Sequence, residues 1–190
     1  MKILTMKFGG TSVADIDRIR AVRDIISDEV KDGWNVVAVV SAMSKETNKL
    51  IDLAKQVGVE NLVDPEYDSL ISTGEDVSSS LLAIALNSIE ISSRSWRGWQ
   101  LPIRTDSFHS NAKIEEINTN QIINSFKEGV KVAVVSGFQG IEQAGRITTL
   151  GRGGSDTSAV AIAATIDAER CDIYPAVSYT HLRAHETSPH

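Results

Sequence analysis

Two glycine-containing loops carry residue types that could bind an anion. The first spans residues 9–12 and follows an apolar run that ends near Lys7, and the second spans residues 151–154 and contains Arg152. Glycine lets backbone N–H groups approach an anion closely, and the N-terminus of a following helix carries roughly half a positive charge. Lys7 could place its ammonium over a phosphoryl group during transfer, while a turn beside a surface lysine is the alternative.

Neither loop has the pattern of the commonest nucleotide-binding motifs. Lys7 precedes the first pair of glycines, whereas a Walker loop places its lysine after them. Asp156 stands where the dinucleotide-binding pattern Gly-x-Gly-x-x-Gly needs its third glycine, which disfavours a dehydrogenase. Arg152 could hold a carboxylate through two parallel hydrogen bonds, which a lysine cannot do; an exposed loop arginine is the alternative.

Three further polar residues could contact a ligand. Glu75 follows Gly74 in an apparent helix, where glycine costs about 1 kcal/mol relative to alanine. Close approach of a ligand or of a second backbone would explain that glycine, and Glu75 could then receive an ammonium group; a solvated helix glutamate is the alternative. Ser41 and Thr47 follow a buried strand, at the end where open α/β sheets bind ligands, although they could simply cap the loop.

The elements that would position these residues alternate between strands and helices. Apolar residues at steps of three and four between Ile16 and Val30 predict a helix, with Ser12 and Asp15 as its capping signature. A polar loop at residues 44–48 leads into a second helix. Strands are predicted at residues 3–8, 36–42, 100–105, 130–136 and from 172 onward, helices at 67–87, 118–127 and 155–168, and a hairpin or loop at 138–150. This order predicts an α/β fold, a three-layer sandwich with a central, mostly parallel sheet.

Composition excludes several classes of protein. The chain has 190 residues and a formal charge of −6, with no cluster of basic residues, which disfavours nucleic acid and anionic membranes as partners. A single cysteine, Cys171, excludes an internal disulfide and favours a reducing compartment. No run approaches the roughly 18 apolar residues of a membrane span, and the first residues do not read as a signal peptide. We expect a cytoplasmic protein with one domain.

The character of the chain changes at Pro175. Residues 175–190 contain three of the four histidines and show no helix or strand period. A histidine cluster could bind a metal, but no acidic or cysteine residues flank it at useful spacing, so a flexible or foreign tail is the preferred reading.

Five segments together resemble the aspartate kinase branch of the amino acid kinase family in order and spacing. They lie at residues 7–13, 40–48, 72–75, 136–138 and 151–156, and the resemblance covers residues 2–174. It implies the amino acid kinase fold, although incomplete, and ATP-dependent phosphorylation of the side-chain carboxylate of L-aspartate. The product would be 4-phospho-L-aspartate, on the route to lysine, threonine and methionine. ATP and Mg²⁺ are the implied cofactors, and the full-length family members imply a homo-oligomer.

The resemblance also implies a role for each matching residue. Lys7 and Asp156 would be the catalytic pair, in which Lys7 stabilises charge on the transferring phosphoryl group and Asp156 orients Lys7. The implied phosphate-binding residues are Gly9, Gly10, Thr11 and Ser12. The implied aspartate-binding residues are Ser41, Thr47, Glu75, Phe138, Arg152 and Ser155. A side-chain carboxyl of aspartate has a pKa near 3.9, so the nucleophile is already ionised at pH 7 and needs no general base.

Two departures from the family pattern modify this expectation. Lys45 occupies a loop position where the family commonly has glycine. After Tyr174 the family continues with Thr-Asp-Val-Asp-Gly into its adenine and ribose site, whereas this chain continues with Pro-Ala-Val-Ser-Tyr. We therefore expect residues 1–174 to be part of an amino acid kinase domain that binds ATP poorly and turns over little, and residues 175–190 to be a disordered or artefactual tail. A non-catalytic interaction fragment, or an enzyme of this fold acting on another substrate, remains the alternative.

Overall fold

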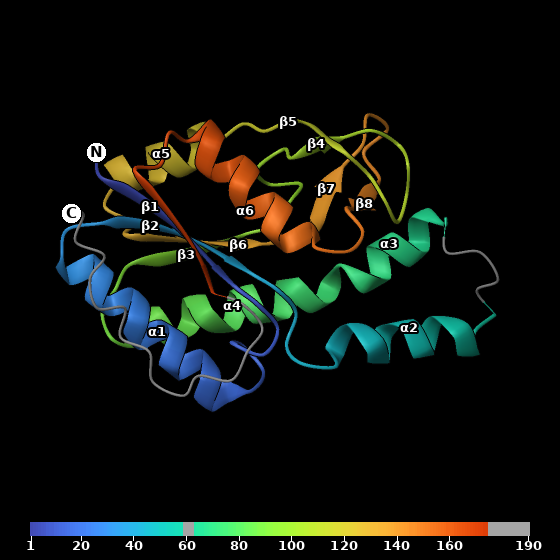
Figure 1. Cartoon of the computed structure of the whole chain (residues 1–190), viewed down its shortest axis with the longest axis horizontal. Coiled ribbons are helices and arrows are strands. Elements are labelled where there is room, and N and C mark those ends of the chain that lie inside the picture. The colour runs from blue at the N-terminus through green and yellow to red at the C-terminus, as the bar shows by residue number, and fades with distance from the viewer. Residues whose placement is uncertain (59–62, 175–190) are drawn as a thin grey trace, which may run out of the picture.

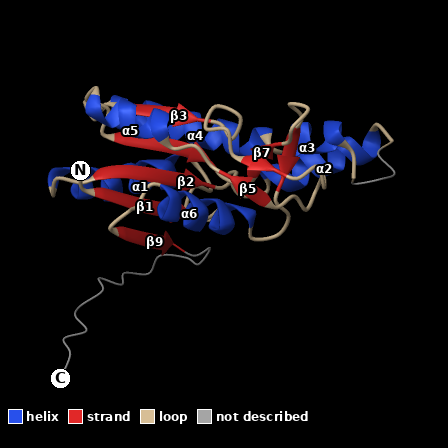
Figure 2. Cartoon of the chain, turned by 90° about the horizontal axis from the view of Figure 1, so that it is seen from above, coloured by secondary structure: helices blue, strands red, loops and turns tan. Residues whose placement is uncertain are grey.

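A parallel sheet forms the centre of the molecule. The computed structural model describes residues 1–58 and 63–174, so the predicted tail at 175–190 lies outside the described residues. Five parallel strands pair in the order β3 (Ser93–Trp96), β6 (Val132–Ser136), β2 (Asn35–Val40), β1 (Ile3–Phe8) and β9 (Arg170–Tyr174). Figure 2 shows β3 and β9 at the two edges of this sheet.

Helices cover both faces of the sheet. Helices α1 (Ile16–Lys31) and α4 (Thr73–Asn87) pack on one face, and α5 (Asn120–Lys127) and α6 (Gly154–Thr165) pack on the other (Figure 1). The predicted three-layer α/β sandwich is therefore confirmed. Among the described residues, no helix combines the length and the apolar character that crossing a bilayer requires.

The alternation of side chains along β1 decides where Lys7 points. Leu4, Met6 and Phe8 are buried in the cluster beneath α1 and α4. Because successive side chains of a strand project to opposite faces, Lys7 projects toward the face that α6 covers. This places its ammonium within reach of the first turn of α6.

A smaller sheet extends the molecule beyond the carboxyl ends of the parallel strands. Its strands pair in the order β5 (Ile114–Glu116), β4 (Arg104–Thr105), β7 (Gln139–Ile141) and β8 (Ile147–Thr149). Helices α2 (Glu46–Gln56) and α3 (Pro65–Ile71) lie at the same end of the molecule (Figure 1). The antiparallel pair β7 and β8 confirms the hairpin predicted within residues 138–150.

The strand predictions were wrong between residues 93 and 116. Strand β3 was missed, because it is a sheet edge whose sequence, Ser-Arg-Ser-Trp, has one apolar side chain. The strand predicted at residues 100–105 is reduced to β4, which belongs to the smaller sheet. The missed β5 has two exposed glutamates and pairs only with this short strand among the described residues.

Helix boundaries also differ from the prediction. The helix predicted at residues 67–87 is two helices, α3 and α4, separated at Ser72. Helix α2 begins at Glu46, within the segment predicted as a loop. Asp15, and not Ser12, caps α1, since its carboxylate accepts a hydrogen bond from the backbone N–H of Arg18 at 2.9 Å. The predicted capping signature therefore placed the first turn three residues too early.

Candidate functional site

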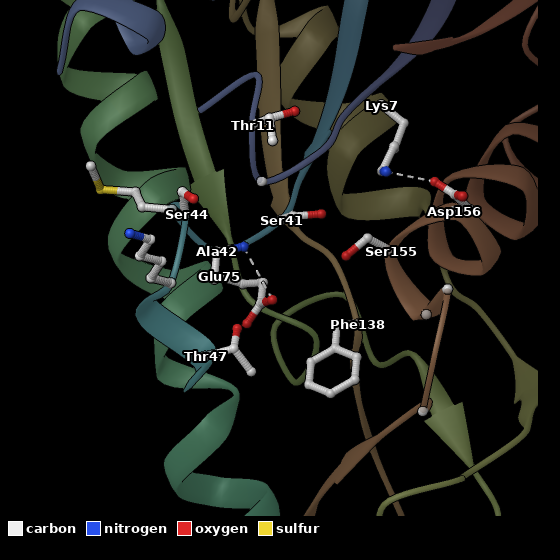
Figure 3. Close-up of a pocket in the computed structure, with 16 residues that line it drawn as sticks. Lys7, Thr11, Ser41, Ala42, Ser44, Thr47, Glu75, Phe138, Ser155 and Asp156 are labelled. Atoms are coloured by element: carbon white, nitrogen blue, oxygen red, sulfur yellow. Dashed lines mark hydrogen bonds and ion pairs between the residues drawn. The ribbon is translucent and has the colours of Figure 1, made fainter. Parts of the chain in front are cut away.

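A cavity of about 410 Å³ opens where β1, β2 and β6 end. This volume lies within the range of about 300–1,000 Å³ that is usual for small-molecule sites. It brings together most of the residues singled out in the sequence (Figure 3): Lys7, Gly10, Thr11, Ser41, Thr47, Glu75, Phe138, Ser155 and Asp156. Carboxyl ends of parallel strands are where open α/β sheets bind ligands, so the topology accounts for this convergence.

Lys7 and Asp156 form an ion pair at one side of the cavity (Figure 3). Their charged atoms, Nζ and Oδ1, lie 2.7 Å apart, and the lysine side chain is 10% exposed while that of Asp156 is 53% exposed. An ammonium has three N–H donors, so Lys7 can hold Asp156 and still donate to an anion in the cavity. The sequence expectation that Asp156 orients Lys7 fits this geometry.

Glu75 presents a buried carboxylate on the other side. Its side chain is 4% exposed, one oxygen (Oε1) accepts a hydrogen bond from the backbone N–H of Ala42 at 3.1 Å, and the other (Oε2) has no partner. The pKa of Glu75 is raised to about 8, chiefly by burial and to a smaller extent by the neighbouring charge of Asp76, while backbone hydrogen bonds partly oppose the shift. A buried carboxyl group with an unused oxygen is suited to a ligand that donates hydrogen bonds, and a positively charged ligand would favour its ionised form.

Gly74 explains how Glu75 reaches Ala42. A Cβ atom on Gly74 would lie 2.8 Å from the Cβ of Ala42, so only glycine lets α4 approach the loop after β2 this closely. Gly74 lies in the first turn of α4 and not in the middle of a helix as predicted, because the helix is interrupted at Ser72. Of the two explanations left open by the sequence, close approach of a second segment is the one observed.

The first glycine loop lies partly outside the cavity. Gly10 and Thr11 line it, whereas Gly9 and Ser12 do not. Ser12 is buried and its hydroxyl has no partner. Residues 13–15 separate the loop from α1, so the loop does not open that helix directly, contrary to the sequence expectation. A phosphate-binding role for Gly9 and Ser12 therefore stays a prediction.

The second glycine loop does open a helix. Gly153, with a φ of 71°, is the N-cap of α6, and the helix begins at Gly154 beside the cavity. Ser155 is buried there, and a Cβ on Gly137 would lie 2.8 Å from its hydroxyl oxygen. The N-terminal dipole of α6 thus lies next to Lys7, which adds a second source of positive potential.

Arg152 lies in an adjoining cavity. It is exposed and lines a space of about 400 Å³ that shares Thr47, Phe138 and Gly151 with the first cavity. The Phe138 ring lies at the boundary between the two spaces, and its backbone adopts a φ of 71°, a left-handed conformation that is uncommon for a bulky residue. The sequence grouped Arg152 with the other predicted residues, and the structure places it beside them.

A buried hydrogen-bond network that the sequence did not reveal holds the turn at Phe138. The side-chain amide of Gln139 donates to Asp76 Oδ1 and to the carbonyl oxygen of Ser72, both at 3.1 Å, and its oxygen accepts from the backbone N–H of Gly98 at 3.0 Å. The backbone N–H of Phe138 donates to the hydroxyl of Ser158 on helix α6 at 3.1 Å. Such long-range partners leave no pattern in the sequence, because each belongs to a different element.

Lys45 adopts a backbone conformation that favours glycine. Its φ is 67°, and it is the N-cap of α2, at the position where the resemblance noted a departure from the family's glycine. Lys45, Ala42, Met43 and Ser44 also line the cavity, and none of them was among the predicted site residues. They line the cavity because of the path that the loop after β2 takes, and their residue types do not indicate that path.

Among the described residues, no group of three or more His, Cys, Asp or Glu side chains is arranged to hold a metal ion.

Comparison with known proteins identifies a family match over residues 2–180, to the amino acid kinase family. The chain is similar to the aspartokinases of Bacillus sp. (strain MGA3) and Geobacillus stearothermophilus, at 50% and 49% identity over 178 residues. These matches cover 94% of this chain and 43% of each relative, so the chain spans less than half the length of these relatives.

Two solved structures share the fold closely. An aspartate kinase from Synechocystis has 43% identity and a TM-score of 0.75, over 90% of this chain and 28% of that one. E. coli aspartokinase III in complex with aspartate and ADP has 26% identity and a TM-score of 0.78, over 91% of this chain and 49% of that one.

Proposed function

The chain belongs to the amino acid kinase family, and we propose that it is part of an aspartate kinase, an enzyme that transfers the γ-phosphoryl group of ATP to the side-chain carboxylate of L-aspartate. The relatives at about 50% identity are aspartokinases, and one solved neighbour was crystallised with aspartate and ADP. The observation that carries the proposal is the presence, in one cavity, of a cation at Lys7 and of a buried carboxyl group at Glu75 that has one oxygen without a hydrogen-bond partner.

These two groups match the two ends of the substrate. The ammonium of L-aspartate would donate to the unused oxygen of Glu75, which removes an unsatisfied buried acceptor. The side-chain carboxylate would then face Lys7 and the N-terminus of α6. Arg152 in the adjoining cavity would hold the α-carboxylate through its guanidinium fork. Ser41, Thr47, Phe138 and Ser155 would surround the amino acid, as the resemblance implies.

Positioning and charge neutralisation would supply the catalysis. The attacking carboxylate is ionised at neutral pH, so no residue has to remove a proton. Lys7, held by Asp156, would stabilise the negative charge that spreads over the transferring phosphoryl oxygens, and residues 9–12 would approach the phosphates. ATP would enter with Mg²⁺, which would neutralise part of the charge on the phosphates.

The same proposal extends to the wider setting of the reaction. Residues 1–174 would form part of an amino acid kinase domain, and the protein would act in the cytoplasm as a homo-oligomer. Its product, 4-phospho-L-aspartate, would supply the synthesis of lysine, threonine and methionine. The support for these statements is the resemblance to aspartate kinases.

Two measurements test the proposal. In a chain that continues after Tyr174 with the family's Thr-Asp-Val-Asp-Gly, acyl phosphate formed from ATP and L-aspartate would be trapped by hydroxylamine and counted against ADP release. Calorimetric titration would compare L-aspartate with succinate, which has the same two carboxylates and no ammonium. We expect L-aspartate to bind and succinate to bind at least about tenfold more weakly, because the buried Glu75 carboxyl would lose its charged partner. Equal affinity for the two ligands would contradict the proposed site.

A further inference from the structure

A second carboxylate, Asp68, is buried completely behind the cavity wall. It lies on α3, is 0% exposed and accepts hydrogen bonds from three residues of distant segments. Thr149 donates its backbone N–H at 2.9 Å and its hydroxyl at 2.8 Å, and Ser110 donates its backbone N–H at 3.0 Å and its hydroxyl at 3.2 Å. The Nδ1 atom of His109 lies 2.9 Å from the carboxylate and, when protonated, donates to it.

These bonds fix the chain segment that leads to Arg152. Thr149 is the last residue of β8, three residues before Arg152, and its carbonyl oxygen also accepts from the backbone N–H of Ala112 at 2.9 Å. A Cβ on Gly151 would lie 2.9 Å from Asn111 Oδ1, so the loop at residues 109–112 presses directly against the start of the second glycine loop. The same carboxylate therefore anchors both β8 and the loop that packs against Gly151.

We propose that Asp68 is a positioning residue that sets the location of Arg152 relative to the cavity. This inference rests on the proposed function, because it assigns Arg152 to the α-carboxylate of the amino acid. A guanidinium fork binds a carboxylate well only when its geometry is held, and a misplacement of about 1 Å can cost on the order of 10²-fold. Arg152 itself is exposed on a loop, so the precision must come from the backbone that carries it.

Helix α3 offers a matched control for this role. Glu66, two residues before Asp68, forms an exposed ion pair with Arg146 of the β7–β8 hairpin. It ties the same helix to the same hairpin, but its side chain is 76% exposed and its ion pair does not involve the loop at residues 109–112. An exposed pair of this kind contributes little to stability. Glu66→Ala therefore tests whether the loss of any contact between α3 and the β7–β8 hairpin is enough to displace Arg152.

Hydrogen exchange and ligand titration test the proposal on the 190-residue chain. In Asp68→Ala, we expect amide exchange at residues 150–155 to accelerate while the amides of β1 and β2 keep their wild-type rates. The affinity for L-aspartate should fall by about 10- to 100-fold. Asp68→Asn keeps one acceptor oxygen and should give an intermediate loss of affinity for L-aspartate. The affinity of Glu66→Ala should stay within about twofold of the wild-type value.

Each outcome decides the question. Wild-type exchange at residues 150–155 in a folded Asp68 variant, with unchanged L-aspartate affinity, would overturn the proposal. Equal acceleration in β1, β2 and residues 150–155 would also overturn it, because it would show a general loss of stability. If Asp68→Ala does not fold, Asp68→Asn provides the same comparison. A wild-type chain that fails to bind L-aspartate would contradict the proposed function, and the exchange pattern would still decide the role of Asp68.

Discussion

Replacing Glu75 by glutamine should make the stability of the protein less dependent on pH. Glu75 is buried, and its pKa is raised from 4.5 to about 8, first by burial and then by the nearby charge of Asp76. Glutamine has nearly the same shape, and its oxygen can still accept from the backbone N–H of Ala42, so the substitution removes the titration and keeps the contact. The difference between the two proteins therefore isolates the Glu75 carboxyl.

The direction of the effect follows from proton counting. Between pH 4.5 and about 8 the folded protein keeps a proton on Glu75 that the unfolded chain has lost, so the free energy of unfolding falls as the pH rises. Each pH unit in this window costs about 1.4 kcal/mol. Between pH 4 and pH 7, the free energy of unfolding of the wild type should therefore fall by about 3 kcal/mol more than that of the glutamine variant.

Urea unfolding of both proteins from pH 4 to pH 9 measures this difference. Other titrating groups are common to the two chains and cancel in the comparison. We expect the stability of the glutamine variant relative to the wild type to increase steadily from pH 4.5, and this difference to become constant above pH 8. Parallel stability curves across this range would refute the reasoning, since they would show that the carboxyl of Glu75 is not held in its neutral form by the fold.

Three further predictions concern ligands and catalysis. Binding of L-aspartate near pH 7 should release about one proton from Glu75, because a bound ammonium favours the ionised carboxylate; titration in buffers of different ionisation enthalpy measures it, and zero release would contradict it. In a chain that continues after Tyr174 with the family's Thr-Asp-Val-Asp-Gly, Lys7→Ala should lower L-aspartate-dependent ADP release by about 10²- to 10³-fold, and unchanged turnover would remove Lys7 from the mechanism. Arg152→Lys keeps the positive charge but loses the two parallel hydrogen bonds of the guanidinium, so it should weaken L-aspartate binding. A change confined to the binding constant for ATP would show that Arg152 does not bind the amino acid.

The sequence predicted the central layers of the fold well, because their signals are local. Strands β1, β2 and β6 are continuous apolar runs, and α1 shows a clear apolar period. It failed where tertiary contacts replace a local signal. The strand β3 has a polar sequence because it forms an edge, and the break at Ser72 divides a pattern that looks continuous.

The candidate site was predicted to a similar extent and for the same reason. Lys7, Glu75 and Asp156 were found from residue type and motif, and they do line one cavity. The backbone N–H of Ala42, which binds Glu75, could not be found, since every residue but proline carries this donor. The buried partners of Asp68 come from elements about 40 and 80 residues away in the chain, and only the folded structure brings them together.

A crystal structure of the chain with L-aspartate tests the central claim most directly. The ammonium of the ligand should lie within about 3 Å of Glu75 Oε2, and its side-chain carboxylate should face Lys7 Nζ. An amino acid bound with its ammonium away from Glu75, or bound outside the cavity, would contradict the proposed site.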